Sequence, residues 1–168
     1  KTQERALQRE RERLTSILKG TNAGSYEANL QTGSVEINDR WAELTGHSQA
    51  ELEPLTLQTL PRLMHPDDIA PAQNALVAHL KGETPYYRFE HRLKHKDGHW
   101  VWVAAHGQVA THTPDGRAEW MAGVYMDIAE RKAAELRVQE LNETLEERVV
   151  ERSAQLNAAM QTLHQSQE

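Results

Sequence analysis

The end of the chain, from residue 127 to residue 168, contains neither glycine nor proline. Because these two residues are the strongest helix breakers, the run predicts one continuous helix, about 60 Å long at a rise of about 1.5 Å per residue. The preceding segment has the two-residue period of a strand, which is carried by Trp120, Ala122, Val124 and Met126. The chain is therefore predicted to pass directly from a strand into a long helix.

The long helix carries a stripe of small and apolar residues at spacings of three and four, from Ala134 to Leu163. Three successive spacings of four between Leu141 and Ser153 break the heptad as a stutter. The stutter either has no consequence in a solvated helix or allows two packings of similar energy, which a neighbouring domain could bias. The stripe predicts a parallel homodimeric coiled coil with these interface residues: Val138, Leu141, Leu145, Val149, Leu156, Met160 and Leu163.

The junction between strand and helix begins at Asp127, and Glu130 follows three residues later. This spacing predicts a capping box, in which Asp127 accepts the Glu130 N–H while the Glu130 side chain reaches back. A contact between Asp127 and Arg131 would add a few tenths of a kcal/mol. We expect four residues to carry a signal from the sheet into the helix: Asp127, Ile128, Glu130 and Arg131.

The composition limits the classes of protein to which the chain can belong. With 168 residues and 38% hydrophobic content, the chain can build one domain of about 100 residues plus extended helices. A net charge of −6 with interleaved signs argues against a nucleic-acid partner. The absence of cysteine excludes disulfides, thiolate metal sites and cysteinyl-flavin chemistry.

No apolar run approaches the length of about 20 residues that a bilayer requires, and the charged start KTQERALQRERER lacks the apolar part of a signal peptide. We therefore expect no membrane insertion by this segment. The expected location is cytoplasmic, either free or in the cytoplasmic part of a membrane-anchored receptor. Both ends lie within helical patterns, which indicates a piece of a longer protein.

Periodicity and turn signals divide the rest of the chain into helices and strands. Residues 1–22 form an amphipathic helix, and residues 25–37 form a hairpin with its turn at Thr32 and Gly33. Three further strands follow the helical middle of the chain, with turns at KDG and PDG. This order predicts an α+β fold with one antiparallel sheet.

Capping residues mark where the predicted helices of the middle segment begin. Asn38 is the expected N-cap of a short helix, and Ser48 and Glu51 have the spacing of a capping box. Asp67 or Asp68 is expected to cap the next helix, because a carboxylate accepts the free N–H groups at a helix start.

Three stretches resemble the motifs of a PAS domain with a C-terminal PAC motif: LMHPDDI, RFEHRLKHKDGHWVWV and PDGRAEWMAGVYMDIAERK. The resemblance covers residues 26–127 and implies a five-stranded antiparallel sheet with short helices on one face that enclose a small pocket. The family commonly has threonine where this chain has Ala129, which removes one hydroxyl from the linker. The implied organisation is a helix over 1–22, a PAS domain over 23–128 and a coiled-coil signalling helix over 129–168.

The tail ELNETLEERVVERSAQLNAAMQTLHQSQE resembles the signalling helix that precedes the phosphoacceptor helices of sensor histidine kinases. This resemblance implies an effector domain downstream in the same chain. We interpret the chain as a sensor, signal-relay and homodimerisation module of a bacterial signalling protein, most directly a histidine kinase. The alternatives are a ligand-free dimerisation scaffold and the PAS sensor of a diguanylate cyclase.

The candidate pocket residues are Trp41, Tyr87, Phe89 and His91. His91 shares strand parity with Tyr87 and Phe89, so its ring should face the interior, where its nitrogens need a protein partner or a polar ligand. We expect a protein partner. The resemblance leaves two alternatives to a chain without cofactor, namely a non-covalent flavin packed on Trp41 and a haem bound by His79.

Metal binding and catalysis find little support in the sequence. His91 and His95 share strand parity and His99 follows the turn, but no cysteine and no carboxylate is expected at ligand spacing, so no metal site is predicted. Asp67 and Asp68 form an acidic pair without an accompanying nucleophile or base. Helix capping explains this pair, and no catalytic residue is predicted.

Overall fold

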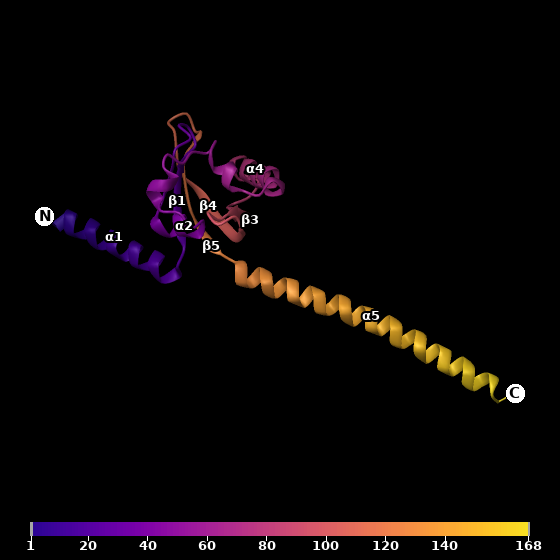
Figure 1. Ribbon diagram of the computed structural model, residues 1–168. Helices are drawn as coiled ribbons and strands as arrows, with labels where there is room; N and C mark the ends of the chain where they lie inside the picture. Colours follow the sequence, from indigo (N-terminus) through magenta and orange to yellow (C-terminus); the bar gives the residue numbers. More distant parts are fainter. Residues whose placement is uncertain (1, 168) are drawn as a thin grey trace. The chain divides into compact units, whose positions relative to one another are not determined.

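The computed structural model describes residues 2–167 and contains an antiparallel sheet of five strands in the order β2-β1-β5-β4-β3 (Figure 1). The strands are β1 (Gly24–Asn29), β2 (Val35–Ile37), β3 (Tyr87–Lys94), β4 (Trp100–His112) and β5 (Ala118–Asp127). Every neighbouring pair is antiparallel. The predicted α+β class with its five-stranded sheet is confirmed.

The helices of the described part are α1 (Thr2–Thr21), α2 (Asp39–Leu44), α3 (Gln49–Leu52), the 3-10 helix η1 (Leu60–Leu63), α4 (Pro66–Leu80) and α5 (Ala129–Gln165). The helix predicted from the glycine-free and proline-free run is α5. The chain divides into two compact units, of which the first ends at Ala129 and the second begins at Glu130. Among residues 2–167, no helix combines the length and the apolar character needed to cross a membrane.

Short-range polar contacts fix the starts of α2 and α3. Asn38 is the N-cap of α2 and accepts the Trp41 N–H at 2.9 Å. The same side-chain oxygen accepts the Ser25 N–H at 2.9 Å, which ties the start of α2 to β1. Ser48 and Glu51 form the predicted capping box. These contacts hold Trp41 against the sheet, where its indole is almost completely buried.

Two glycines make room for Tyr26 on the inner face of the sheet. Tyr26 on β1 stands opposite Gly123 on β5, which stands opposite Gly107 on β4. A β-carbon at Gly123 would lie 2.8 Å from Tyr26 Cε1, and one at Gly107 would overlap the Tyr26 hydroxyl. The phenol therefore lies across β5 and ends over β4, on a floor that a larger side chain would block.

The core lies between this inner face and the helices that cover it, with α2 packed on β1 and α4 packed on β3 (Figure 1). On β3 the predicted parity is correct. His91 and Leu93 are completely buried, and Tyr87 is nearly so. Phe89 is half-buried.

The start of α4 differs from the prediction. Its N-cap is His65, whose Nδ1 accepts the Asp67 N–H at 3.2 Å. Asp68 instead binds Arg92 on β3, accepting hydrogen bonds from the backbone N–H at 2.8 Å, from Nε at 3.0 Å and from Nη2 at 2.8 Å. These bonds hold the pKa of the Asp68 carboxyl below its ordinary value. Asp68 therefore fixes α4 to the sheet, and helix capping does not explain it.

Replacing Asp68 by asparagine is expected to lower the free energy of unfolding by about 2 kcal/mol, because Arg92 loses its anionic partner in a partly buried position. Urea denaturation at pH 7 measures this loss. Glu43→Gln is the control, since Glu43 pairs with Arg40 at 3.5 Å on the surface and should contribute less than about 0.5 kcal/mol. Equal losses in the two variants would contradict the role assigned to Asp68.

Candidate functional site

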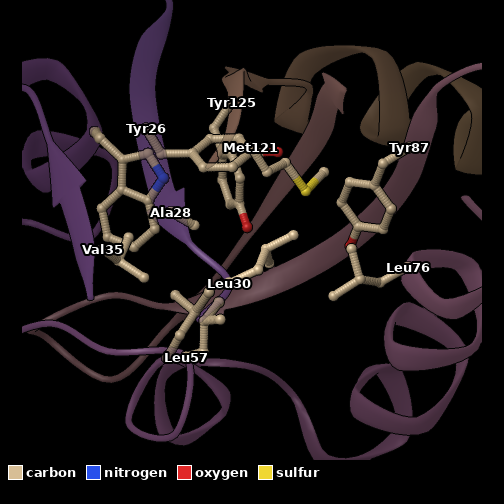
Figure 2. Close-up of a pocket in the computed structure, with 11 residues that line it drawn as sticks. Tyr26, Ala28, Leu30, Val35, Leu57, Leu76, Tyr87, Met121 and Tyr125 are labelled. Atoms are coloured by element: carbon tan, nitrogen blue, oxygen red, sulfur yellow. The ribbon is translucent and has the colours of Figure 1, made fainter. Parts of the chain in front are cut away.

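A small cavity lies between the inner face of the sheet and the segments that cover it. Its volume is about 70 Å³. Its lining consists of Tyr26, Ala28, Leu30, Val35, Trp41, Leu57, Leu60, Leu76, Tyr87, Met121 and Tyr125. Figure 2 shows Tyr26, Tyr87 and Tyr125 around the cavity. None of the lining side chains carries a permanent charge, so the cavity is apolar except for its phenol and indole groups.

Four buried polar atoms at or beside the cavity have no hydrogen-bond partner among residues 2–167. They are the Tyr26 hydroxyl, Trp41 Nε1 and both ring nitrogens of His91. Tyr26 and Trp41 line the cavity, and His91 packs edge-on against Tyr125 with 5.3 Å between ring centroids. A buried polar group without a partner costs about 1–3 kcal/mol. A bound polar molecule or water at the cavity would remove this cost.

Burial keeps the titratable groups around the cavity uncharged. Burial, opposed by the nearby Asp68 carboxylate, lowers the pKa of His91 to about 4, so the ring is neutral at pH 7. Burial raises the pKa of Tyr87 to about 12. It also raises the pKa values of Tyr26 and Tyr125 above that of a free phenol. The cavity therefore offers neutral donors and acceptors, and no ion.

The structure brings two of the four predicted pocket residues, Trp41 and Tyr87, to the cavity wall. His91 lies beside it, and Phe89 stacks on His91 with 6.0 Å between ring centroids. The expectation that a protein group satisfies His91 is wrong, because neither ring nitrogen has a partner in the described part of the chain. His91 is buried as predicted, and a bound molecule or water could satisfy its ring nitrogens.

Strand β5 connects the cavity with the start of α5. Met121 and Tyr125 are its buried residues and line the cavity. The residues whose alternation predicted this strand, from Trp120 to Met126, lie on its other face, which is half-buried. The sequence analysis therefore did not identify Met121 and Tyr125 as cavity residues. Two positions after Tyr125, Asp127 Oδ1 accepts the Ala129 N–H at 2.8 Å. The backbone N–H of Ile128, which lies between Asp127 and Ala129, donates to the Trp102 carbonyl oxygen on β4 at 3.0 Å.

Helix α5 exposes the apolar stripe that the sequence predicts. No residue of α5 is buried, and each predicted interface residue from Val138 to Leu163 exposes more than half of its surface. Leu136 and Val150 are equally exposed but lie off the stripe. The coiled-coil interface stays a prediction, as do the contacts of Asp127 with Glu130 and Arg131.

His79, the residue considered as a haem ligand, uses both of its ring nitrogens. Its Nε2 accepts the Val109 N–H at 3.2 Å, and its Nδ1 donates to the Thr84 carbonyl oxygen at 2.9 Å. A haem iron would have to displace the bond to Val109 and leave a backbone N–H of β4 without a partner. This arrangement disfavours His79 as an axial ligand.

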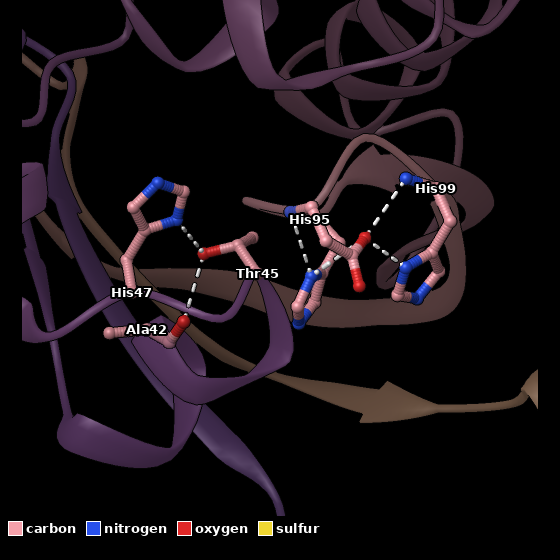
Figure 3. Close-up of polar contacts among 6 residues, drawn as sticks. Ala42, Thr45, His47, His95 and His99 are labelled. Atoms are coloured by element: carbon pink, nitrogen blue, oxygen red, sulfur yellow. Dashed lines mark hydrogen bonds and ion pairs between the residues drawn. The ribbon is translucent and has the colours of Figure 1, made fainter.

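The turn between β3 and β4 holds a polar cluster that the sequence interpretation missed. Asp97 joins His95 and His99, and one ligand atom from each of the three lies within 4.8 Å of the others. The two imidazole rings stack with 4.4 Å between centroids, and Figure 3 shows the polar contacts that connect them. The expectation that no carboxylate stands at ligand spacing is therefore wrong. That expectation compared residues on one face of a strand. The turn instead brings together His95, Asp97 and His99, which are two positions apart in sequence.

Comparison with known proteins identifies the fold. A family model for the PAS fold matches residues 34–125. The structure of a sensory box histidine kinase/response regulator from Burkholderia thailandensis E264 is 28% identical with a TM-score of 0.69, covering 79% of this chain and 97% of that chain. The N-terminal domain of a diguanylate cyclase with PAS/PAC sensor from Marinobacter aquaeolei is 25% identical with a TM-score of 0.57, covering 66% of this chain and 98% of that chain. No curated protein sequence matches the chain.

A five-stranded antiparallel sheet with a small cavity beneath its covering segments defines an α+β domain with the PAS fold. The chain belongs to the PAS family, since the family match spans more than half of its residues. Its PAS sensor domain, which is non-catalytic, is related to those of histidine kinases and diguanylate cyclases. The recognition based on the three sequence motifs is confirmed.

Proposed function

We propose that the chain is the sensor, relay and homodimerisation module of a bacterial signal-transduction protein, with a histidine kinase as its effector. A compact uncharged molecule binds in the cavity and displaces β5. The displacement passes through Asp127 and Ile128 into a parallel coiled coil formed by α5. The proposed organisation is a helix over residues 1–22, a PAS domain over 23–128 and a signalling helix over 129–168, in the cytoplasm.

The path of β5 is the observation that carries this proposal. Met121 and Tyr125 contribute to the cavity wall, and Asp127 follows on the same strand. Because side chains alternate along a strand, Asp127 belongs to the same face as Tyr125, at a distance of about 7 Å along the strand. A ligand that displaces Tyr125 therefore acts on the backbone segment from which α5 starts.

The groups around the cavity define the chemistry of the ligand. Trp41 Nε1 can only donate a hydrogen bond, whereas the Tyr26 hydroxyl and the neutral His91 ring can both donate and accept. An ionised ligand would lose its hydration without meeting an opposite charge. A cavity of about 70 Å³ is far smaller than the sites of about 300 Å³ or more that hold drug-sized molecules. We expect an uncharged molecule of few atoms, with an acceptor that faces Trp41.

The same cavity size favours a second candidate, a ligand-free dimerisation scaffold. A space of about 70 Å³ holds a few water molecules, which could satisfy the unpartnered donors and acceptors. The only function would then be to hold two chains in parallel. The relative from Marinobacter aquaeolei supports a further alternative, in which the sensor regulates a diguanylate cyclase.

Native mass spectrometry tests the proposal on the chain purified from bacterial cytoplasm without added ligand. We expect the mass of two chains with a stoichiometric small molecule, and its release in His91→Leu, which lacks both ring nitrogens. Two bare chains in the parent and in the variant would contradict ligand binding and support the scaffold. A single chain at micromolar concentration would contradict the homodimer.

A test of the relay requires a variant that leaves the cavity unchanged. Asp127→Ala removes the carboxylate that accepts the Ala129 N–H but changes no lining residue. In the full-length protein we expect unchanged ligand occupancy and loss of the ligand-dependent change in effector activity. Regulation equal to that of the parent would contradict a relay through Asp127.

A further inference from the structure

We propose that the turn between β3 and β4 binds a divalent transition-metal ion through His95, Asp97 and His99. One donor atom from each residue lies within 4.8 Å of the others. Two imidazole nitrogens and one carboxylate oxygen form a donor set that suits Zn²⁺ and leaves a position for water. None of the three residues lines the cavity under the sheet, so this inference does not depend on the ligand proposed there.

The three side chains of the turn converge on one another. His95 Nδ1 lies 3.2 Å from the Asp97 backbone nitrogen and 3.1 Å from Asp97 Oδ1. The same carboxylate oxygen also contacts His99 Nδ1. Both imidazoles therefore present a ring nitrogen to one carboxylate oxygen, and an ion bound among these atoms would be coordinated by the nitrogen and oxygen donors that Zn²⁺ accepts.

The backbone of the turn is held by contacts outside the cluster. The Lys96 N–H donates to the Thr45 carbonyl oxygen at 2.8 Å, and Lys96 Nζ binds Glu51 Oε1 at 2.7 Å. The His95 ring lies directly over Gly46, where a β-carbon would overlap it. The turn is therefore docked on the segment between α2 and α3. A preformed backbone lowers the entropy cost of gathering the ligands.

The side chains need only a small movement to coordinate the ion. Tetrahedral Zn²⁺ with bonds of about 2.1 Å requires ligand atoms about 3.4 Å apart. Asp97 and His99 are 61% and 58% exposed, so their side chains can rotate toward His95 without disturbing the core. The site is thus built from one anchored ligand and two adjustable ones.

The cluster also adjoins the start of α5. His95 and His99 line a surface hollow together with Glu43 and Asp127. Arg40, which pairs with Glu43, is the cationic residue of the same lining. A metal ion in this place would act on the same junction as the cavity ligand and would give the domain a second input.

Calorimetric titration of the full chain, without a polyhistidine tag, with ZnCl₂ tests the site. We expect one ion per chain and binding that is about 10- to 100-fold weaker in His99→Ala and in Asp97→Asn. Both side chains are exposed, so thermal unfolding without metal should be unchanged in these variants. MgCl₂ should give no binding heat, because Mg²⁺ prefers oxygen ligands. His112→Ala, an exposed residue at the end of β4, is the control and should bind Zn²⁺ as the parent does.

Amide chemical shifts in ¹⁵N-labelled protein locate the bound ion. Zn²⁺ should move the signals of the turn, of Trp100 and of Asp127. Affinity that is unchanged in both cluster variants, or shifts confined to other histidines such as His164, would overturn the proposal. Absence of binding at Zn²⁺ concentrations up to about 1 mM would also overturn it.

Discussion

Lowering the pH from 7.5 to 4.5 is expected to reduce the free energy of unfolding by about 2.5 kcal/mol through His91 alone. Burial lowers the pKa of this ring from 6.5 in an exposed setting to about 4. Between these values the unfolded chain binds a proton that the folded chain does not, so stability is full above pH 6.5 and decreases as the pH falls. The slope should approach about 1.4 kcal/mol per pH unit.

Urea denaturation between pH 4.5 and 7.5 at fixed protein concentration measures this slope. The lower limit keeps Asp68 ionised, because its bonds to Arg92 hold its pKa below the ordinary value of 3.8. His91→Leu should remove most of the slope and should be at least as stable as the parent at pH 7, because it replaces unpartnered nitrogens by apolar atoms. His112→Gln, which changes an exposed ring, should retain the slope. A parent protein with flat stability over this range would show that burial does not keep the His91 ring uncharged.

Features that depend on residues close in sequence were predictable. The Asn38 cap and the capping box of Ser48 with Glu51 each involve positions three apart, whose separation helix geometry fixes whatever the rest of the fold does. Strand alternation placed His91 on the inner face for the same reason. These signals, together with the order of strands and helices, were sufficient for the fold class.

Features that depend on strand order were not predictable. Asp68 was assigned to helix capping because its partner, Arg92, lies 24 residues away and comes within reach only when α4 packs on β3. The path of Tyr26 over Gly123 and Gly107 likewise requires β1, β5 and β4 to be neighbours in that order. A single sequence does not state which strands pair.

The candidate sites also combine features that nearby residues predict with features that depend on the complete fold. Parity predicts that His91 is buried, but the lack of a partner depends on every polar group within reach, so it follows only from the complete fold. Asp97 is different, because the KDG turn was recognised in the sequence. A tight turn brings the residues on its two sides together, and this geometry, applied to His95 and His99, would have found the cluster.

Replacing Leu141 and Leu145 together by lysine is expected to raise the dissociation constant of the dimer by about a thousandfold or more. Both residues belong to the stripe, where they enclose the first of the three spacings of four, and both are exposed on α5 of a single chain. Burial of one leucine contributes about 2 kcal/mol, and a parallel dimer would lose four such contacts while burying ammonium groups without partners. Sedimentation equilibrium of the full chain measures the change.

The matched control places the same two charges off the stripe. Leu136 and Val150 are as exposed as the interface residues, so Leu136→Lys with Val150→Lys adds equal charge and removes similar apolar surface. This control should remain a dimer. If it dissociates like the first variant, total charge and not the stripe determines assembly. If neither dissociates, residues outside α5 hold the dimer. Only selective dissociation of the first variant fits a signal that passes along the stripe of α5. The proposed relay requires that the two chains touch through this stripe, because the contact between the two α5 helices is the contact that a displacement of β5 would change.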